Sequence, residues 1–288
     1  MEFKRYIINE KSGAYLDRFC HTPSPTAMPN MLKRPAVLVC PGGGYSSCCP
    51  REGDPVAYQF LAADFNTFVL NYSINEHAVF PNSLLDLCAA MKLIRENAEE
   101  FGVIEDKIAV LGFSAGGHLT ASLGVYWNDP EIMEKSGCKN GENKPNALML
   151  IYPVISTSWM ENNNVMDRLV GDNDYPSYCK KLNLHTGVTK DTPPAFLCHT
   201  VRDGGVPCED SIKFASAMIE AGVPCELHLF PNGPHGMALG TPETAGIYSS
   251  DVSFAQWPGL AIHWLKRLFA APEEGYAPLE KAKYSSQY

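Results

Sequence analysis

The chain has 288 residues, a formal net charge of −9 and 45% hydrophobic residues, an ordinary apolar share for a protein with a substantial core. The acidic charge argues against a nucleic-acid partner or an anionic membrane, because either would require a basic surface. Residues 1–6 contain no apolar signal segment, and no window reaches the roughly 18 uninterrupted apolar residues of a membrane span. We therefore expect a cytoplasmic protein with no membrane or nucleic-acid partner.

The ten cysteines are scattered along the chain, and no two of them form a CxxC pair. A structural zinc site would show paired ligands at short spacing, so no metal site is expected. Cys40, Cys198 and Cys225 stand inside apolar runs, where a thiol behaves as a small hydrophobic group. Reduced thiols are typical of the cytoplasm.

The first predicted element is an antiparallel hairpin with strands at residues 3–8 and 14–19, followed by a Pro-rich connector at 21–30. After it, short apolar runs alternate with helix-like stretches. The runs cover residues 36–40, 67–72, 108–113, 147–152, 195–199 and 226–230. Because they are apolar nearly throughout, they are typical of strands that are covered on both faces in a parallel sheet.

Helices are predicted between these runs. The clearest apolar stripe has members three and four residues apart: Leu84, Leu87, Met91, Ile94 and Ala98. A helix over residues 211–221 ends at Gly222, where a left-handed C-cap belongs, and Leu260, Trp264 and Leu268 mark a last helix. A hairpin followed by repeated β-α units predicts one α/β domain over residues 1–288, with a mostly parallel twisted sheet and helices on both faces.

Three segments depart from this alternation. Residues 128–144 are polar and rich in Gly and Asn, which indicates an inserted loop. Residues 155–192 carry only a weak helical pattern at Val165–Val170, and we expect a lid or substrate loop there. Residues 272–288 are polar and rich in tyrosine, and we expect this tail to pack loosely or to contact another subunit of a homo-oligomer.

A GxSxG motif occupies residues 112–116, with Ser114 at its centre. The apolar run 108–113 precedes it and a helix-like stretch over 115–125 follows, which is the context of a nucleophile elbow. The flanking glycines leave room for the neighbouring strand and helix around a strained turn. The serine hydroxyl then lies at a helix N-terminus, whose dipole favours negative charge. We expect Ser114 to be a catalytic nucleophile.

A serine hydroxyl is a poor nucleophile unless a base and an orienting carboxylate accompany it. In this arrangement the partners follow the serine in the order Asp or Glu, then His, each after the end of a strand. Asp203 follows the run 195–199 and His235 follows the run 226–230, both in loops rich in Gly and Pro. We expect these two residues to complete a triad with Ser114.

The other histidines and aspartates fit these roles less well. His199 and His228 fall within strands and His263 within the last helix, so all three are expected to be structural. His118 lies one turn after Ser114 on its helix, and we expect it to brace the elbow. No strand directly precedes the remaining candidates: His21, His77, His185, Asp174 and Asp251.

A Pro-Gly-Gly-Gly-Tyr sequence at residues 41–45 follows the run 36–40. It lies about 70 residues before Ser114, where the loop that forms an oxyanion hole belongs in this arrangement. Glycine lets the backbone approach a substrate carbonyl closely, and the developing oxyanion needs preorganised N–H donors. We expect these donors to be Gly43, Gly44 and Ala115, the last being the residue after the nucleophile.

Four motifs together resemble the bacterial acetyl esterase/lipase group of α/β-hydrolases: residues 41–45, 112–118, 203–207 and 235–236. Within that group the chain is similar, over residues 34–268, to intracellular carbohydrate acetylesterases associated with xylan breakdown. The resemblance implies an α/β-hydrolase fold and the removal of acetyl groups from sugar hydroxyls through an acyl-enzyme on Ser114. The implied partner is a small-molecule ester or an acetylated oligosaccharide, and no cofactor or metal is expected.

Two positions depart from the group's pattern. Pro41 begins the glycine loop where enzymes of the hormone-sensitive-lipase type carry histidine. Arg202 stands where family members often have a second aspartate. This leaves Asp203 as the candidate and puts beside it a cation that can alter substrate preference.

Several residues near the motifs have two open roles. Tyr45, Tyr152 and Trp159 can stack on a sugar ring or pack in the core. Arg51 and Glu52 can line the site or brace the glycine loop through an ion pair.

Three other functions also remain open. A feruloyl or other aryl esterase shares the machinery but needs a deep aromatic acyl pocket. An amidase or peptidase shares it too, although prolyl-peptidase relatives carry a propeller domain for which this chain has no room. A hydrolase-fold binding protein typically lacks a triad member or an oxyanion glycine, whereas all are present here.

Overall fold

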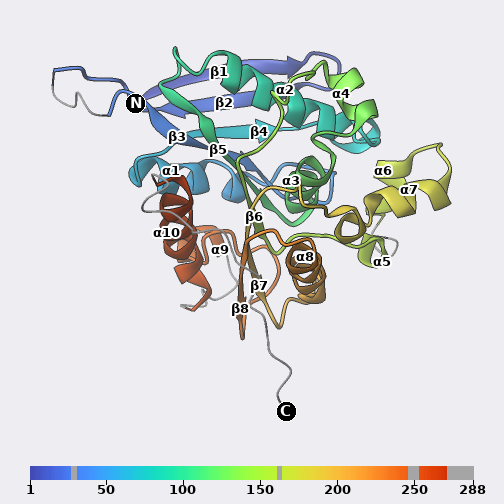
Figure 1. Cartoon of the computed structure of the whole chain (residues 1–288). Coiled ribbons are helices and arrows are strands. Elements are labelled where there is room, and N and C mark those ends of the chain that lie inside the picture. The colour runs from blue at the N-terminus through green and yellow to red at the C-terminus, as the bar shows by residue number, and fades with distance from the viewer. Residues whose placement is uncertain (27–30, 161–163, 246–252, 271–288) are drawn as a thin grey trace.

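The computed structural model describes residues 1–26, 31–160, 164–245 and 253–270. Within these ranges, eight strands form one twisted sheet in the order β1-β2-β4-β3-β5-β6-β7-β8 (Figure 1). β1 (Glu2–Asn9) and β2 (Ala14–Cys20) form the predicted antiparallel hairpin, and β2 also pairs antiparallel with β4 (Asn66–Asn71). The other pairs are parallel, so the sheet is mixed and mostly parallel, as predicted.

The six predicted apolar runs all form strands. In chain order they are β3 (Arg34–Cys40), β4, β5 (Val103–Phe113), β6 (Ala147–Ile151), β7 (Ala195–Thr200) and β8 (Cys225–Phe230). β3, β4, β6 and β7 lie inside the sheet and are buried nearly throughout. β8 is an edge strand with mostly half-buried side chains, because it has only one neighbouring strand.

Helices cover both faces of the sheet (Figure 1). One face carries α1 (Asp54–Ala62) and α10 (Trp257–Phe269), which share a core cluster containing Phe60, Trp257 and Trp264. The other face carries three helices: α2 (Asn82–Glu96), α3 (Ser114–Tyr126) and α8 (Glu209–Glu220). The four predicted helical stretches are present as α2, α3, α8 and α10. The apolar stripe of the first lies in one buried cluster, with its last member, Ala98, just beyond the end of α2.

The shorter helices are α4 (Pro130–Ser136), α5 (Thr157–Met160), α6 (Val165–Val170), α7 (Tyr175–Leu182) and α9 (Pro242–Ala245). Single 3₁₀ turns are η1 (Pro50–Glu52), η2 (Asn75–His77), η3 (Leu184–Gly187) and η4 (Phe254–Gln256). None of the helices in the described ranges combines the length and the apolar composition that a membrane span requires.

The prediction of an inserted loop at residues 128–144 is wrong, because the segment contains α4. The carboxylate of Asp129 caps this helix by accepting hydrogen bonds from the N–H groups of Glu131 and Ile132. Gly137 ends it in the left-handed conformation, with φ +67°. A cap, a proline at the first helical position and a glycine at the end are standard boundary signals, and they outweigh the polar composition.

Residues 155–192 contain α5, α6, α7 and η3, and Val165–Val170 is helical as the weak pattern suggested. Most of its buried apolar side chains pack into the same core cluster as α2, whereas Ile155 and Leu184 pack into a second cluster with side chains of α8. It also touches the glycine loop, because Arg168 donates a hydrogen bond to the carbonyl of Gly44. The predicted tail at 272–288 lies outside the described residues.

Candidate active site

The GxSxG motif forms a sharp turn between β5 and α3. β5 ends at Phe113 and α3 begins at Ser114, whose φ of +51° is strained for a residue with a side chain. A Cβ on Gly112 would lie 2.1 Å from the carbonyl oxygen of Gly116, and one on Gly116 would lie 2.1 Å from the carbonyl oxygen of Cys40. Only glycine fits at these two positions, so the motif's residues are required by the packing of strand against helix.

The structure brings Ser114, His235 and Asp203 into one chain of hydrogen bonds. His235 Nε2 lies 2.8 Å from Ser114 Oγ, and His235 Nδ1 lies 2.8 Å from Asp203 Oδ2. Because the carboxylate can only accept, Nδ1 carries the proton and Nε2 is left to accept from the serine hydroxyl. The three residues follow β5, β7 and β8 at the carboxyl edge of the sheet, as the sequence predicts.

Both carboxylate oxygens of Asp203 accept hydrogen bonds. Its Oδ1 accepts hydrogen bonds from the backbone N–H groups of Gly205 and Val206, at 2.8 and 2.9 Å. Burial acts to raise the pKa of the Asp203 carboxyl, but hydrogen bonds from His199 and His235 outweigh it and hold the pKa well below its ordinary value. The group is therefore a carboxylate that can orient an imidazole and stabilise it when charged.

His199 has a role at the site that its position within a strand did not indicate. Its Nε2 lies 3.3 Å from Asp203 Oδ2 and 3.1 Å from the carbonyl oxygen of Val206. Its Nδ1 lies 2.8 Å from the hydroxyl of Ser211. Both neighbours of Nε2 are acceptors, so Nε2 carries the proton and His199 donates toward the Asp203 loop. The only sequence signal for this contact is its position four residues before Asp203.

His118 lies away from the proposed base and braces the helix behind the elbow, as expected. Its Nδ1 is 2.9 Å from the hydroxyl of Tyr45, and its Nε2 is 3.3 Å from the carbonyl oxygen of Leu182. Burial lowers the pKa of His118 to about 4, so the ring is neutral near neutral pH.

The glycine loop faces Ser114 with its backbone. Gly43 and Gly44 have φ of +132° and +60°, and the Gly43 carbonyl turns inward to accept from the N–H groups of Ser46 and Ser47. Among the described residues, neither Gly43 nor Gly44 donates a backbone hydrogen bond to the protein. Ala115 lies in the first turn of α3, where N–H groups have no partner within the helix. Three N–H groups are thus free to bind an oxyanion.

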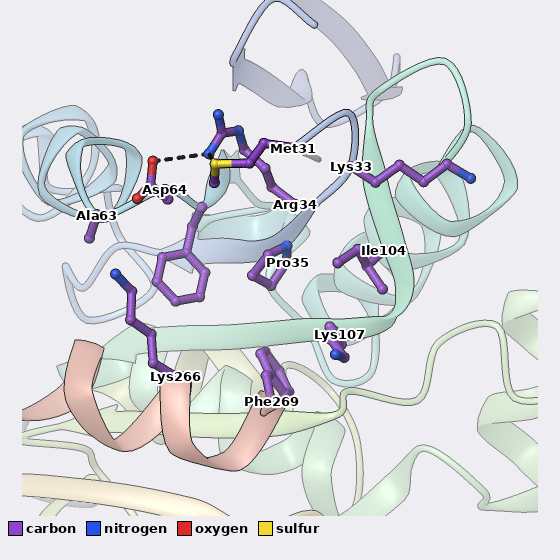
Figure 2. Close-up of a pocket in the computed structure, with 11 residues that line it drawn as sticks. Met31, Lys33, Arg34, Pro35, Ala63, Asp64, Ile104, Lys107, Lys266 and Phe269 are labelled. Atoms are coloured by element: carbon purple, nitrogen blue, oxygen red, sulfur yellow. Dashed lines mark hydrogen bonds and ion pairs between the residues drawn. The ribbon is translucent and has the colours of Figure 1, made fainter. Parts of the chain in front are cut away.

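A cavity of about 240 Å³ opens at these groups. Its lining in the described chain is Gly43, Gly44, Cys49, Arg51, Glu52, Ser114, His235 and Gly236. A second hollow, of about 280 Å³, lies near the start of β3 and the end of α10, where Figure 2 shows Arg34 paired with Asp64 above Lys266 and Phe269. Among the described residues that line it there is no serine, cysteine or histidine, so these residues offer no nucleophile for acyl transfer.

Glu52 braces the site through hydrogen bonds, not through the ion pair with Arg51 that the sequence left open. Its Oε2 accepts from the Gly42 N–H at 2.7 Å, and its Oε1 accepts from the Tyr152 hydroxyl at 2.8 Å. Tyr152 in turn accepts from the Ala238 N–H at 2.8 Å. Burial raises the pKa of the Glu52 carboxyl, and these hydrogen bonds oppose that rise.

Tyr45 and Tyr152 are buried core residues, so the structure favours packing over sugar stacking for both. The Tyr152 ring meets the His235 ring edge-on, with centroids 5.1 Å apart. The side chain of Trp159 and the residue Asp251 lie outside what the structure describes. Arg202 is exposed and does not line the cavity.

Comparisons with known proteins agree with this architecture. The BD-FAE family model matches residues 26–218. One similar solved structure is that of MGS-M1, an α/β-hydrolase enzyme from a Medee basin deep-sea metagenome library. Its sequence is 33% identical to this one, and the match covers 93% of this chain and 98% of the MGS-M1 chain, with a TM-score of 0.76. An acetyl ester-xyloside bifunctional hydrolase from Caldicellulosiruptor lactoaceticus is 32% identical over 88% of each chain, with a TM-score of 0.73.

Curated relatives are longer than this chain. The acetylxylan esterase of Xylanibacter ruminicola is 28% identical over 83% of this chain, which spans 47% of that protein's length. The chain spans 35% of the length of another curated relative, the endo-1,4-beta-xylanase B of Butyrivibrio fibrisolvens. The likeness to α/β-hydrolase esterases that the motifs indicated is confirmed, and the chain belongs to the BD-FAE family with an α/β-hydrolase fold.

Proposed function

We propose that this chain is a serine carboxylesterase that removes acetyl groups from xylo-oligosaccharides or related sugars. The observation that carries the proposal is the hydrogen-bonded chain Ser114–His235–Asp203, which opens on a cavity edged by the glycine loop. Acyl transfer through a covalent intermediate requires a nucleophile, a base hydrogen-bonded to it and a carboxylate that orients the base, and this chain of hydrogen bonds supports these three roles.

In the proposed mechanism, His235 takes the proton of Ser114 as Oγ attacks the ester carbonyl carbon. The N–H groups of Gly43, Gly44 and Ala115 bind the resulting oxyanion. When the tetrahedral intermediate collapses, the ester C–O bond breaks and His235 returns the proton to the leaving alcohol oxygen. Water then attacks the acyl-enzyme with His235 as base, which releases the acid and restores the Ser114 hydroxyl.

The shape of the cavity favours a short acyl group over an aryl one. At about 240 Å³ the cavity is smaller than the pockets of about 300–1,000 Å³ that enclose drug-sized ligands. Its lining in the described chain includes glycines and charged groups but no Phe, Tyr or Trp. A feruloyl group would find no aromatic wall there, whereas an acetyl group needs none.

The sugar assignment is supported by the relatives. One is named an acetylxylan esterase and another an acetyl ester-xyloside bifunctional hydrolase, and the second covers 88% of this chain.

The proposed location is the cytoplasm. All ten cysteines lie in described ranges and no disulfide joins any two of them, which supports a reducing compartment.

The first test is acetate release from acetylated xylo-oligosaccharides. Ser114→Ala should lower the rate by about 10⁴-fold or more, because the covalent route is lost. The matched control is Ser216→Ala, an exposed serine on α8, which should retain the full rate. A fluorophosphonate probe should label the wild type and not Ser114→Ala, and failure to label would favour a binding protein without catalysis.

The same assays separate the alternative substrates. Release from p-nitrophenyl acetate without release from the oligosaccharides would overturn the sugar assignment and leave the esterase mechanism standing. A higher kcat/KM for p-nitrophenyl ferulate than for the acetate would favour the aryl esterase.

A further inference from the structure

A cation lies in the same cavity as the proposed nucleophile and base. Arg51 belongs to the turn η1 and lines the cavity together with Ser114 and His235. Its guanidinium lies against Gly236, because a Cβ placed on that glycine would come within 3.0 Å of Arg51 Nη2. Arg51 is therefore next to the peptide that directly follows the base.

Among the described residues, this cation makes no hydrogen bond to the protein, although its charge acts on the nearby Glu52 carboxylate and lowers the pKa of that group. Arg51 Nε is buried without a hydrogen-bond partner, and no carboxylate oxygen lies within 4.0 Å of the guanidinium. The nearby Glu52 uses both carboxylate oxygens to accept from Gly42 and Tyr152. A partly buried charge without a hydrogen-bond partner costs free energy, and an arginine offers five donors in a planar fork that matches a carboxylate.

The position of Arg51 relative to His235 tells which part of a substrate it would meet. In the proposed mechanism His235 delivers a proton to the leaving alcohol oxygen, so the alcohol portion of the ester lies on the side of His235. Arg51 abuts the residue after His235, whereas the oxyanion donors lie on the glycine loop and on α3. A group that reaches the guanidinium therefore belongs to the alcohol portion.

We propose that Arg51 binds a carboxylate on the sugar portion of the ester, so that the preferred substrates are acetylated oligosaccharides that carry a uronic acid. This inference rests on the proposed esterase function and specifies its substrate class. A bidentate guanidinium–carboxylate contact is charge-assisted and directional, so it selects acidic sugars over neutral ones. Arg51 is then a specificity-determining residue, separate from the three residues that carry the acyl transfer.

The test compares two substrates that differ only in the carboxylate. One is an acetylated xylo-oligosaccharide with a glucuronic acid branch, and the other is the same compound after reduction of its carboxyl to a primary alcohol. The wild type should show a kcat/KM about 10- to 100-fold higher for the acid, the range expected of a charge-assisted hydrogen-bonded pair. Raising the ionic strength should reduce this ratio, and that measurement needs no variant.

Variants then assign the preference to its residue. Arg51→Met should bring the ratio of the two kcat/KM values close to one, and Arg51→Lys should retain part of it as a point charge. Arg202→Met is the matched control: it removes an exposed cation beside Asp203 that does not line the cavity, and should leave the ratio as in the wild type.

Three outcomes would overturn the inference. The first is equal rates of the wild type on both substrates. The second is an equal loss of rate on both substrates in Arg51→Met. The third is a wild-type preference for a hemisuccinate ester over an acetate ester, if Arg51→Met abolishes that preference. The last would assign the cation to the acyl side. Acetate release from the neutral substrate that depends on Ser114 would keep the esterase proposal in each case, and its absence would overturn the function itself.

Discussion

Single side chains at the cavity connect the loops that form it. The Glu52 carboxylate holds the Gly42 N–H of the glycine loop on one oxygen and the Tyr152 hydroxyl on the other. Tyr152 then holds the Ala238 N–H and packs its ring against His235. One buried carboxylate thus connects the proposed oxyanion loop with the loop that carries the base.

Glu52→Gln is predicted to damage both stability and turnover. Glutamine has the same shape, but its amino group cannot accept, so either the Gly42 N–H or the Tyr152 hydroxyl loses its acceptor. The free energy of unfolding should fall by about 1–3 kcal/mol, as measured by urea unfolding. The kcat for p-nitrophenyl acetate should fall more than KM rises, because the displaced loop binds the oxyanion less well in the transition state.

The control for this change is Glu220→Gln, at the exposed end of α8, which should alter neither quantity. If Glu52→Gln also left both the unfolding free energy and kcat as in the wild type, the connecting role of Glu52 would be wrong.

At the scale of elements, the elbow depends on how closely α3 approaches β3 and β5. The backbone of Gly116 lies so close to the carbonyl of Cys40 at the end of β3 that no side chain fits between them. This contact sets the start of α3, and with it the position of Ser114 above the sheet edge. The glycines of the motif are therefore required both by the sharp turn at Ser114 and by the close contact of α3 with β3 and β5.

Gly116→Ala is predicted to lower the free energy of unfolding by about 3 kcal/mol or more, because the new Cβ overlaps backbone atoms that cannot move independently. Gly259→Ala in α10 is the matched control, since nothing lies within 4 Å of its Cβ position and its side is exposed. That change should raise stability by about 0.5–1 kcal/mol, because alanine favours a helix. Thermal unfolding measures both, and equal effects would contradict the close packing at the elbow.

At the scale of the whole molecule, the parallel sheet collects residues that are far apart in sequence. Ser114 and His235 are 121 positions apart and yet share a hydrogen bond, because β5, β7 and β8 all end at one edge. The same architecture buries ionisable groups that water would otherwise hydrate, and these groups make the stability of the molecule depend on pH.

Acidification is predicted to destabilise the molecule through the buried ring of His118. Burial lowers the pKa of His118 from 6.5 to about 4, so the unfolded chain takes up this proton more readily than the folded one. The free energy of unfolding should therefore fall as the pH is lowered from about 6.5 to about 4, by roughly 3 kcal/mol from this group. Urea unfolding at a series of pH values measures the slope.

His118→Gln should reduce the dependence of the unfolding free energy on pH between these values, because glutamine does not titrate. His263→Gln, at an exposed position on α10, should leave it unchanged. A slope that stayed the same in His118→Gln would assign the acid sensitivity to other groups.

The sequence by itself determined the strands, the longer helices and the proposed triad. Central strands are apolar on both faces, glycines mark a turn that excludes a Cβ, and reactive residues directly follow strands whose ends meet at one edge. Each of these signals is local, so Ser114, Asp203 and His235 could be found without the tertiary structure. The capping residues of α4 are also a local signal, but the polar composition of residues 128–144 led to the prediction of a loop.

Only the tertiary structure decided which distant side chains meet. That Glu52 binds Gly42 and Tyr152, that His199 faces Asp203 and that Arg51 Nε has no hydrogen-bond partner in the described protein all depend on side chains from separate elements. No periodicity encodes such contacts, because the sequence specifies which faces are buried, whereas the partner of a buried polar atom depends on how the elements pack in three dimensions.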